Sequence, residues 1–164
     1  MLKAHPLIVL ADDENHSVMA SGPLIATLWR KETRAEDVIK LGSELDKRAR
    51  AYGRSIGAFM VVEENAPLPS SAARRAMAES LTRAAVAFLA VLFEGNGFRA
   101  AAVRGVVTGV SLLSPPPYPY KAFGKLEEAA AWAGHRARGA GLSQLTPLTV
   151  AQVVSTLRSV PRPR

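Results

Sequence analysis

Apolar residues along this chain fall into short continuous runs and into longer stretches with helical spacing. The short runs are rich in valine, leucine and phenylalanine and predict strands; they lie at 7–11, 16–20, 23–30, 55–63, 86–93 and 120–124. The first three are joined by the turn-like sequences DDEN and SGP, which predicts antiparallel pairing. The runs at 55–63 and 86–93 are almost continuously apolar, which is typical of parallel strands covered on both faces.

The helical stretches have recognisable ends and inner faces. Thr33 and Glu36 stand at the capping-box spacing and predict the start of a first helix, which Gly53 ends. Ser70 predicts the N-cap of a second helix, and a fourth is expected at 126–138. The predicted inner residues of the first three helices are Val38, Leu41, Leu45 and Ala49, then Ala73, Met77, Leu81 and Ala84, then Phe98, Ala102, Val106 and Val110.

Strands followed by alternating helices and strands predict an α/β fold, with one mixed sheet and helices on its faces. We expect a domain at 1–138 and a basic C-terminal extension at 139–164, set off by the sequence GAG. Thr146 and Pro147 begin an amphipathic helix in this extension. Its apolar face needs a partner surface, which we expect to be the chain's own domain, although a homodimer through this helix stays open.

The positive charge of the chain is unevenly placed. The formal net charge is +7, and it arises after position 82, where 10 basic residues accompany 3 acidic ones. Such asymmetry attracts nucleic acid, anionic lipid or an acidic protein. A solvated basic surface is the simpler interpretation, and nucleic-acid binding is not expected because aromatic residues are not interleaved with the cations.

Composition and motifs exclude several kinds of chemistry. The chain has no cysteine, so it contains no disulfide or thiol nucleophile. His5, His16 and His135 have no metal-ligand spacing, and no nucleophile motif is present, so we expect no metal, no cofactor and no catalytic residue. The first 15 residues are too polar for a signal peptide or a membrane span, and we expect a cytoplasmic protein.

The stretch EGNGFRAAAVRG has the composition of an anion site at the start of a helix. Glycines permit close approach of a ligand, and a helix N-terminus presents free amides and a positive dipole end. The candidate anion-binding residues are Gly95, Gly97, Arg99 and Arg104. The glycine spacing matches neither a P-loop nor a dinucleotide fingerprint, and a tight strand-to-helix connection uses the same residues, so a structural role is the favoured interpretation.

Three stretches in order carry a family resemblance: FMVVEENAPLPSSAARRAMAESL, GFRAAAVRGVVTGVSLL and YPYKAFGKLEEAAAWAG. From about Pro6 to Arg138 the chain resembles the STAS and SpoIIAA-like superfamily, and more narrowly its uncharacterised bacterial single-domain branch of STAS/SEC14-type proteins. The resemblance implies N-terminal antiparallel strands followed by parallel ones. It also implies a regulatory, non-enzymatic module for protein–protein interaction.

In antagonists of this superfamily a partner kinase phosphorylates a serine or threonine at the start of the second helix. Ser70 and Ser71 occupy that place, and Arg74 and Arg75 are the adjacent candidate partner contacts. The acidic residue ahead of the serine and the glycine behind it, usual in the family, are missing here. The alternative function is binding of a small anionic or lipid-like ligand at the C-terminal ends of the parallel strands.

Overall fold

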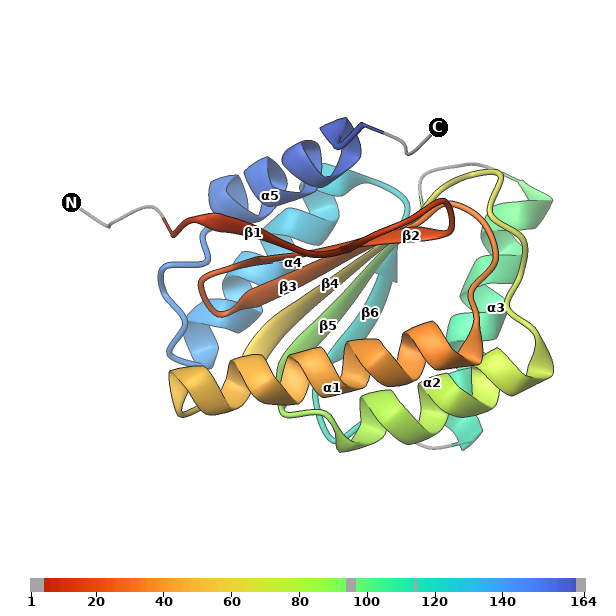
Figure 1. Ribbon diagram of the computed structural model, residues 1–164, viewed down its shortest axis with the longest axis horizontal. Helices are drawn as coiled ribbons and strands as arrows, with labels where there is room; N and C mark the ends of the chain where they lie inside the picture. The colour runs from red at the N-terminus through yellow and green to blue at the C-terminus, as the bar shows by residue number, and fades with distance from the viewer. Residues whose placement is uncertain (1–4, 94–96, 114, 162–164) are drawn as a thin grey trace.

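The computed structural model describes residues 5–93, 97–113 and 115–161, and its strands form one six-stranded sheet (Figure 1). The strands lie in chain order, β1-β2-β3-β4-β5-β6, with β1, β2 and β3 antiparallel and β3 to β6 parallel. Their bounds are Leu7–Asp12, His16–Ser21, Leu24–Trp29, Ile56–Val62, Val86–Phe93 and Tyr120–Phe123. The predicted α/β class with a mixed sheet is confirmed.

In the residues that the structure describes, five helices cover the two faces of this sheet. They are α1 (Ala35–Tyr52), α2 (Ser71–Arg83), α3 (Phe98–Leu113), α4 (Leu126–Gly139) and α5 (Pro147–Ser159). Figure 1 shows α1 and α2 side by side on one face, α4 and α5 on the other, and α3 beyond α2 at the β6 side. The chain is therefore a three-layer α/β/α structure.

Alternation along the central strands explains why both faces are filled. In β4, Phe59 and Val61 pack with α4 and α5, whereas Ala58 and Met60 pack with α1 and α2. Successive side chains of a strand point to opposite faces, so a continuous apolar run supplies two cores at once. The prediction that 55–63 and 86–93 are strands covered on both faces is confirmed.

The predicted capping box at the first helix is wrong. The helix begins at Ala35 with Arg34 as its N-cap, and no side chain caps it. Thr33 is buried, and Glu36 pairs with Arg34, with 3.5 Å between its Oε1 and the arginine Nη1. The inner face and the stop at Gly53, which has a φ of 63°, are as predicted.

The predicted inner stripe of α3 is also wrong in part. Phe98 is 89% exposed, whereas Ala100 and Val103 are buried beside Phe93. The alanine-rich and valine-rich sequence has apolar residues on several sides, so its periodicity does not select one face. The side chain of Val110 lies outside the described residues.

The last helix packs within the chain. Thr146 accepts a hydrogen bond from the Thr149 N–H at 3.1 Å and caps α5. The apolar face of α5 joins the core formed by α4 and strands β2 to β5; its buried residues are Val150, Val153, Val154 and Leu157. In the described part of the chain, every helix is too short or too polar to cross a membrane.

Candidate functional site

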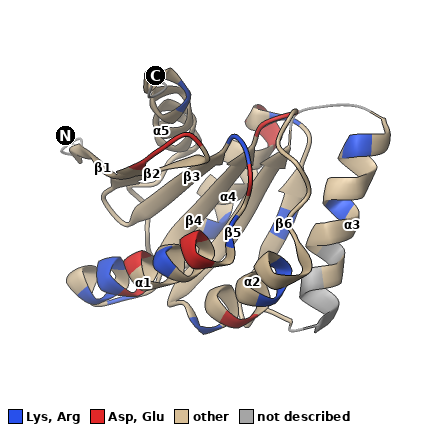
Figure 2. Ribbon diagram, turned by 45° about the vertical axis from the view of Figure 1, so that its right-hand side comes forward, with Lys and Arg blue, Asp and Glu red and all other residues tan. Residues whose placement is uncertain are grey.

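A large cavity lies at the carboxyl ends of β5 and β6, between the first turns of α3 and α4. Its volume is about 880 Å³, and Phe93, Val103 and Phe123 belong to its apolar wall. Figure 2 shows basic positions on both α3 and β6 around this end of the sheet. The carboxyl ends of parallel strands are where ligands of open α/β sheets bind.

Three cations line the cavity and come from three different elements. Arg104 belongs to α3, Lys121 to β6, and Lys125 precedes α4. Among the described lining residues Glu128 is the one acid, which leaves a formal excess of two positive charges. All three basic side chains are exposed, so they can reorient toward an anion that enters.

The positive end of α4 lies at the same place. Lys125 is its N-cap in an extended conformation, with φ of −132°, and its side chain accepts no hydrogen bond from the amides of the first turn. The first amides of a helix have no partner inside the helix, and they carry the positive end of the helix dipole. These amides add to the positive potential that the basic side chains create.

Aromatic rings form the side of the cavity near α4. The Trp132 ring lies 5.5 Å from that of Phe123 and meets Phe88 edge-on at 6.1 Å, both between ring centroids. Lys121 Nζ lies 5.4 Å from the centroid of the Phe123 ring. The cavity thus joins apolar surface to positive charge, which suits a ligand that has an apolar body and an anionic group.

Of the predicted anion-binding residues that the structure describes, Arg104 alone lines this cavity. Its Nε donates to the Ala100 carbonyl oxygen at 3.2 Å. Arg99 donates to the Ala66 carbonyl and thereby ties the start of α3 to the loop before α2. Gly97 is exposed with a φ of 88°, and Gly95 lies outside the described residues.

The sequence did not lead us to predict Lys121, Lys125 or Trp132 as site residues, although one signal pointed to the two lysines. Lys121 lies in the last predicted strand, and Lys125 comes directly before the predicted fourth helix. The rule that ligands bind at the carboxyl ends of strands applies to this connection as well as to the glycine-flanked one. Their approach to Arg104 depends on the pairing of β6 with β5, which no local pattern specifies.

The predicted regulatory serines lie on the exposed first turn of α2. Ser70 Oγ accepts a hydrogen bond from the Ala73 N–H at 3.1 Å, so Ser70 is the N-cap. Arg74 donates through Nη2 to Ser71 Oγ at 3.2 Å and through Nη1 to the Pro69 carbonyl at 3.2 Å. Arg75 is exposed on the same helix.

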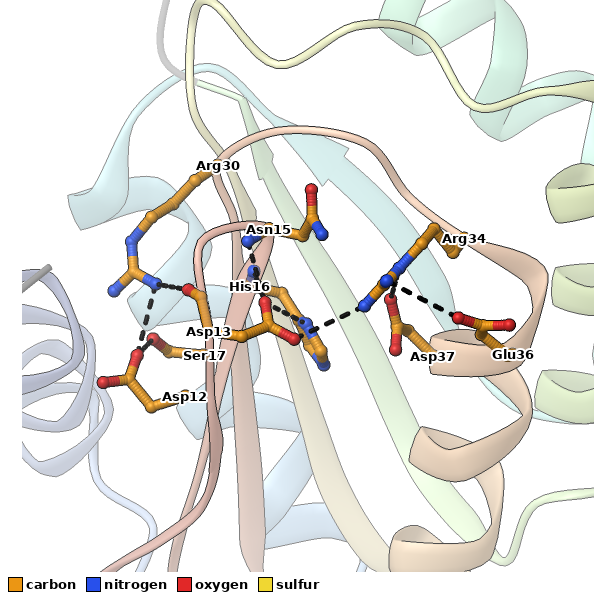
Figure 3. Close-up of polar contacts among 9 residues, drawn as sticks. All are labelled: Asp12, Asp13, Asn15, His16, Ser17, Arg30, Arg34, Glu36 and Asp37. Atoms are coloured by element: carbon orange, nitrogen blue, oxygen red, sulfur yellow. Dashed lines mark hydrogen bonds and ion pairs between the residues drawn. The ribbon is translucent and has the colours of Figure 1, made fainter. Parts of the chain in front are cut away.

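A second polar cluster, drawn in Figure 3, lies at the turn between β1 and β2. It brings Asp13 and His16 close to Asp37 of α1. Each of the three residues has one potential metal-ligand atom, and these atoms lie within 4.8 Å of one another, which is close enough to hold a metal ion. His16 Nδ1 lies 3.2 Å from Asp13 Oδ1, and its ring stacks on Trp29 with 4.9 Å between centroids. No local pattern predicts this cluster, because Asp37 is remote in the chain from Asp13 and His16.

The guanidinium of Arg34 reaches both carboxylates of this cluster. Its Nε lies 2.7 Å from Asp37 Oδ2, and its Nη2 lies 3.4 Å from Asp13 Oδ2. The hydrogen bond with Asp37 raises the pKa of Arg34 above its usual value. Arg34 thus pairs with both acids, and the cluster ties the β1–β2 turn to the start of α1.

The pKa of Asp13 reflects its hydrogen bonds within the β1–β2 turn. Burial alone would raise it, but the backbone N–H groups of His16 and Asn15 and the His16 side chain act in the opposite direction, and the net shift is downward. Asp13 Oδ1 accepts from Asn15 N at 2.7 Å and from His16 N at 2.9 Å. The carboxylate of Asp13 therefore stabilises the turn in its charged form.

Comparison with protein-family models, with curated proteins and with solved structures finds no match to this chain. A function is therefore inferred from the chain's own residues and geometry.

Proposed function

We propose that this protein is a non-enzymatic binding module that takes a small amphiphilic anion into the cavity at the ends of β5 and β6. The observation that carries the proposal is the lining of this cavity, in which three cations adjoin a wall of aromatic and aliphatic side chains. A carboxylate or phosphate head fits among Arg104, Lys121 and Lys125. An apolar body fits against Phe123 and Trp132.

Each part of the lining contributes differently to such binding. Burial of apolar surface supplies most of the affinity, at about 25 cal/mol for each Å² removed from water. The exposed cations contribute less energy individually, because water and salt screen them, but they select the sign of the ligand charge. The module is thus expected to prefer anionic amphiphiles to neutral or cationic ones with the same chain.

A set of matched ligands tests this preference. Decanoate and decyl phosphate are compared with decanol and decyltrimethylammonium by thermal unfolding and by calorimetric titration. A ligand at 100 times its Kd stabilises the folded state by about 2.7 kcal/mol, which for a chain of this size raises Tm by about 5–10 °C. Equal shifts with all four ligands, or no shift, would contradict the proposal.

A charge reversal locates the site. Arg104→Glu places a negative charge in the lining and is expected to weaken decanoate binding about ten-fold or more. Lys40→Glu makes the same change on the exposed surface of α1, away from the cavity lining, and serves as the matched control. If both variants weaken binding equally, the anion is attracted by the overall charge and not by this cavity.

We propose a second function, docking of a protein partner at the start of α2 under control of phosphorylation at Ser71. The hydrogen bond from Arg74 to the exposed Ser71 hydroxyl supports it, because a phosphate on Ser71 would meet both this guanidinium and the amides of the first turn. This is the regulatory function that the STAS resemblance implies. Ser70 is less suited, because its Oγ already caps the helix.

Phosphosite mapping tests the second function. The protein is incubated with ATP in lysate from its source cells, and phosphate is located by mass spectrometry in the native chain and in Ser71→Ala. Phosphate on Ser71 that changes the affinity of a co-purifying protein is the expected result. Phosphate found elsewhere, or binding unchanged by Ser71→Ala, would refute it.

A further inference from the structure

A second, narrow cavity lies between the sheet and the helices α2 and α3. Its volume is about 60 Å³, and we call it the slot. Its lining includes side chains of four neighbouring strands, from Trp29 of β3 to Tyr120 of β6. Apolar side chains supply most of the rest, among them Met60, Met77, Leu89, Val91 and Val106.

The slot and the basic cavity share one lining residue. Val103 lines both, and it is buried in a small cluster with Phe93 and Ala100, which line the basic cavity alone. The Val103 side chain is short. It belongs to α3, whose first turn is held to the loop before α2 by the hydrogen bond from Arg99 to the Ala66 carbonyl.

The two cavities differ in chemistry in a complementary way. The cations of the basic cavity are absent from the described lining of the slot, whose two methionines are flexible and adapt to a linear apolar group. A volume of 60 Å³ holds roughly four water-sized groups, since one such group needs about 15 Å³. This corresponds to about four methylene or methyl groups in a row.

We propose that the basic cavity and the slot form one site for a linear single-chain anionic amphiphile. The head lies among the cations, and the last carbons of the chain pass Val103 into the slot toward Trp29. This inference rests on the proposed ligand-binding function, and it adds the shape of the ligand. Branched or ring-containing anions fill the basic cavity without reaching the slot.

Chain length is the first measurable consequence. Each methylene that enters the slot strengthens binding about four-fold, so affinity rises steeply over about four carbons and then levels off. Val106→Phe fills the slot from α3, because Val106 lines the slot and not the basic cavity. The ratio of the Kd values for short and long carboxylates then falls toward one, whereas Val106→Ala preserves or raises this ratio.

The two tryptophans of the chain report the position of the ligand directly. Trp29 lines the slot and Trp132 lines the basic cavity, and the chain contains no other tryptophan. In Trp132→Phe the emission comes from Trp29 alone. Dodecanoate with bromine on its terminal carbon is expected to quench this emission by contact, and dodecanoate with bromine on the carbon beside the carboxylate is not.

The outcomes separate this inference from the function on which it rests. Quenching of Trp29 by the terminal bromine, with chain-length dependence lost in Val106→Phe, supports the combined site. If calorimetry shows that both bromo acids bind Trp132→Phe but neither quenches Trp29, the slot is not used and only the basic cavity binds. If neither acid binds at all, both the inference and the proposed function are wrong.

Discussion

Replacing Gly134, at the contact between α4 and α5, sets a gain in helix propensity against overlap with Pro147. Gly134 lies inside α4, where an alanine would normally stabilise the helix by about 1 kcal/mol. A Cβ at this position would stand 2.6 Å from Pro147 Cδ, 2.8 Å from Cγ and 2.9 Å from the Pro147 nitrogen. These atoms belong to a rigid ring and to the backbone at the first position of α5, so they cannot yield as a flexible side chain does.

Gly134→Ala must therefore push α5 away from α4. Inserting a methyl group into a filled contact costs about 1–3 kcal/mol, which exceeds the gain in helix propensity. We expect a net loss of about 1 kcal/mol in the free energy of unfolding, or about 2–4 °C in Tm for a chain of this size. The urea concentration at the unfolding midpoint, followed by circular dichroism, measures this loss of stability.

A matched glycine gives the control. Gly105 lies inside α3, and among the described residues a Cβ there meets no atom within 4 Å besides those of its chain neighbours and its own helix backbone. Gly105→Ala is expected to stabilise the protein by up to about 1 kcal/mol. If Gly134→Ala raises the urea midpoint as much as Gly105→Ala does, α5 does not pack on α4 as closely as the structure shows, and the reasoning fails.

Three further predictions concern the core, the polar turn and the cap of α2. Leu157→Ala removes a fully buried side chain of α5 and should cost about 2–5 kcal/mol, independently of protein concentration; a Tm that varies with concentration would instead indicate docking on a second copy. The folded-state pKa of Asp13 lies below its unfolded value of about 3.9, so its contribution is complete above that pH and is lost as pH falls through the folded pKa. Asp13→Asn should consequently destabilise the protein in urea at pH 7 more than at pH 3, and an equal effect at both would contradict this. Ser70→Ala should lower the free energy of unfolding by about 1 kcal/mol through loss of the cap, whereas Ser71→Ala should change it by less than about 0.5 kcal/mol, and equal effects would show that Ser70 is not the cap.

The regular elements were predictable because their signals are local. The continuous apolar runs at 55–63 and 86–93 indicated strands buried on both faces, and the structure places β4 and β5 there. Ser70 and the pair Thr146 and Pro147 marked helix starts correctly, since capping depends on groups within one turn. The local signal for a cap at Thr33 was wrong, because its side chain is buried. Arg34 is the N-cap of α1 instead, and it pairs with the remote Asp13 and with the nearby Asp37.

The faces of the helices and the candidate site were decided by tertiary packing. Apolar residues surround much of α3, so only its position against Phe93 selects Ala100 and Val103 as the inner side and leaves Phe98 outside. Arg104 and Lys125 come together because β6 pairs with β5 and brings the start of α4 beside that of α3. By itself the sequence determined which segments are strands and helices, because hydrophobic periodicity acts over a few residues. Only the tertiary structure decided which charges share a cavity, because that depends on strand order and on contacts between segments far apart in the chain.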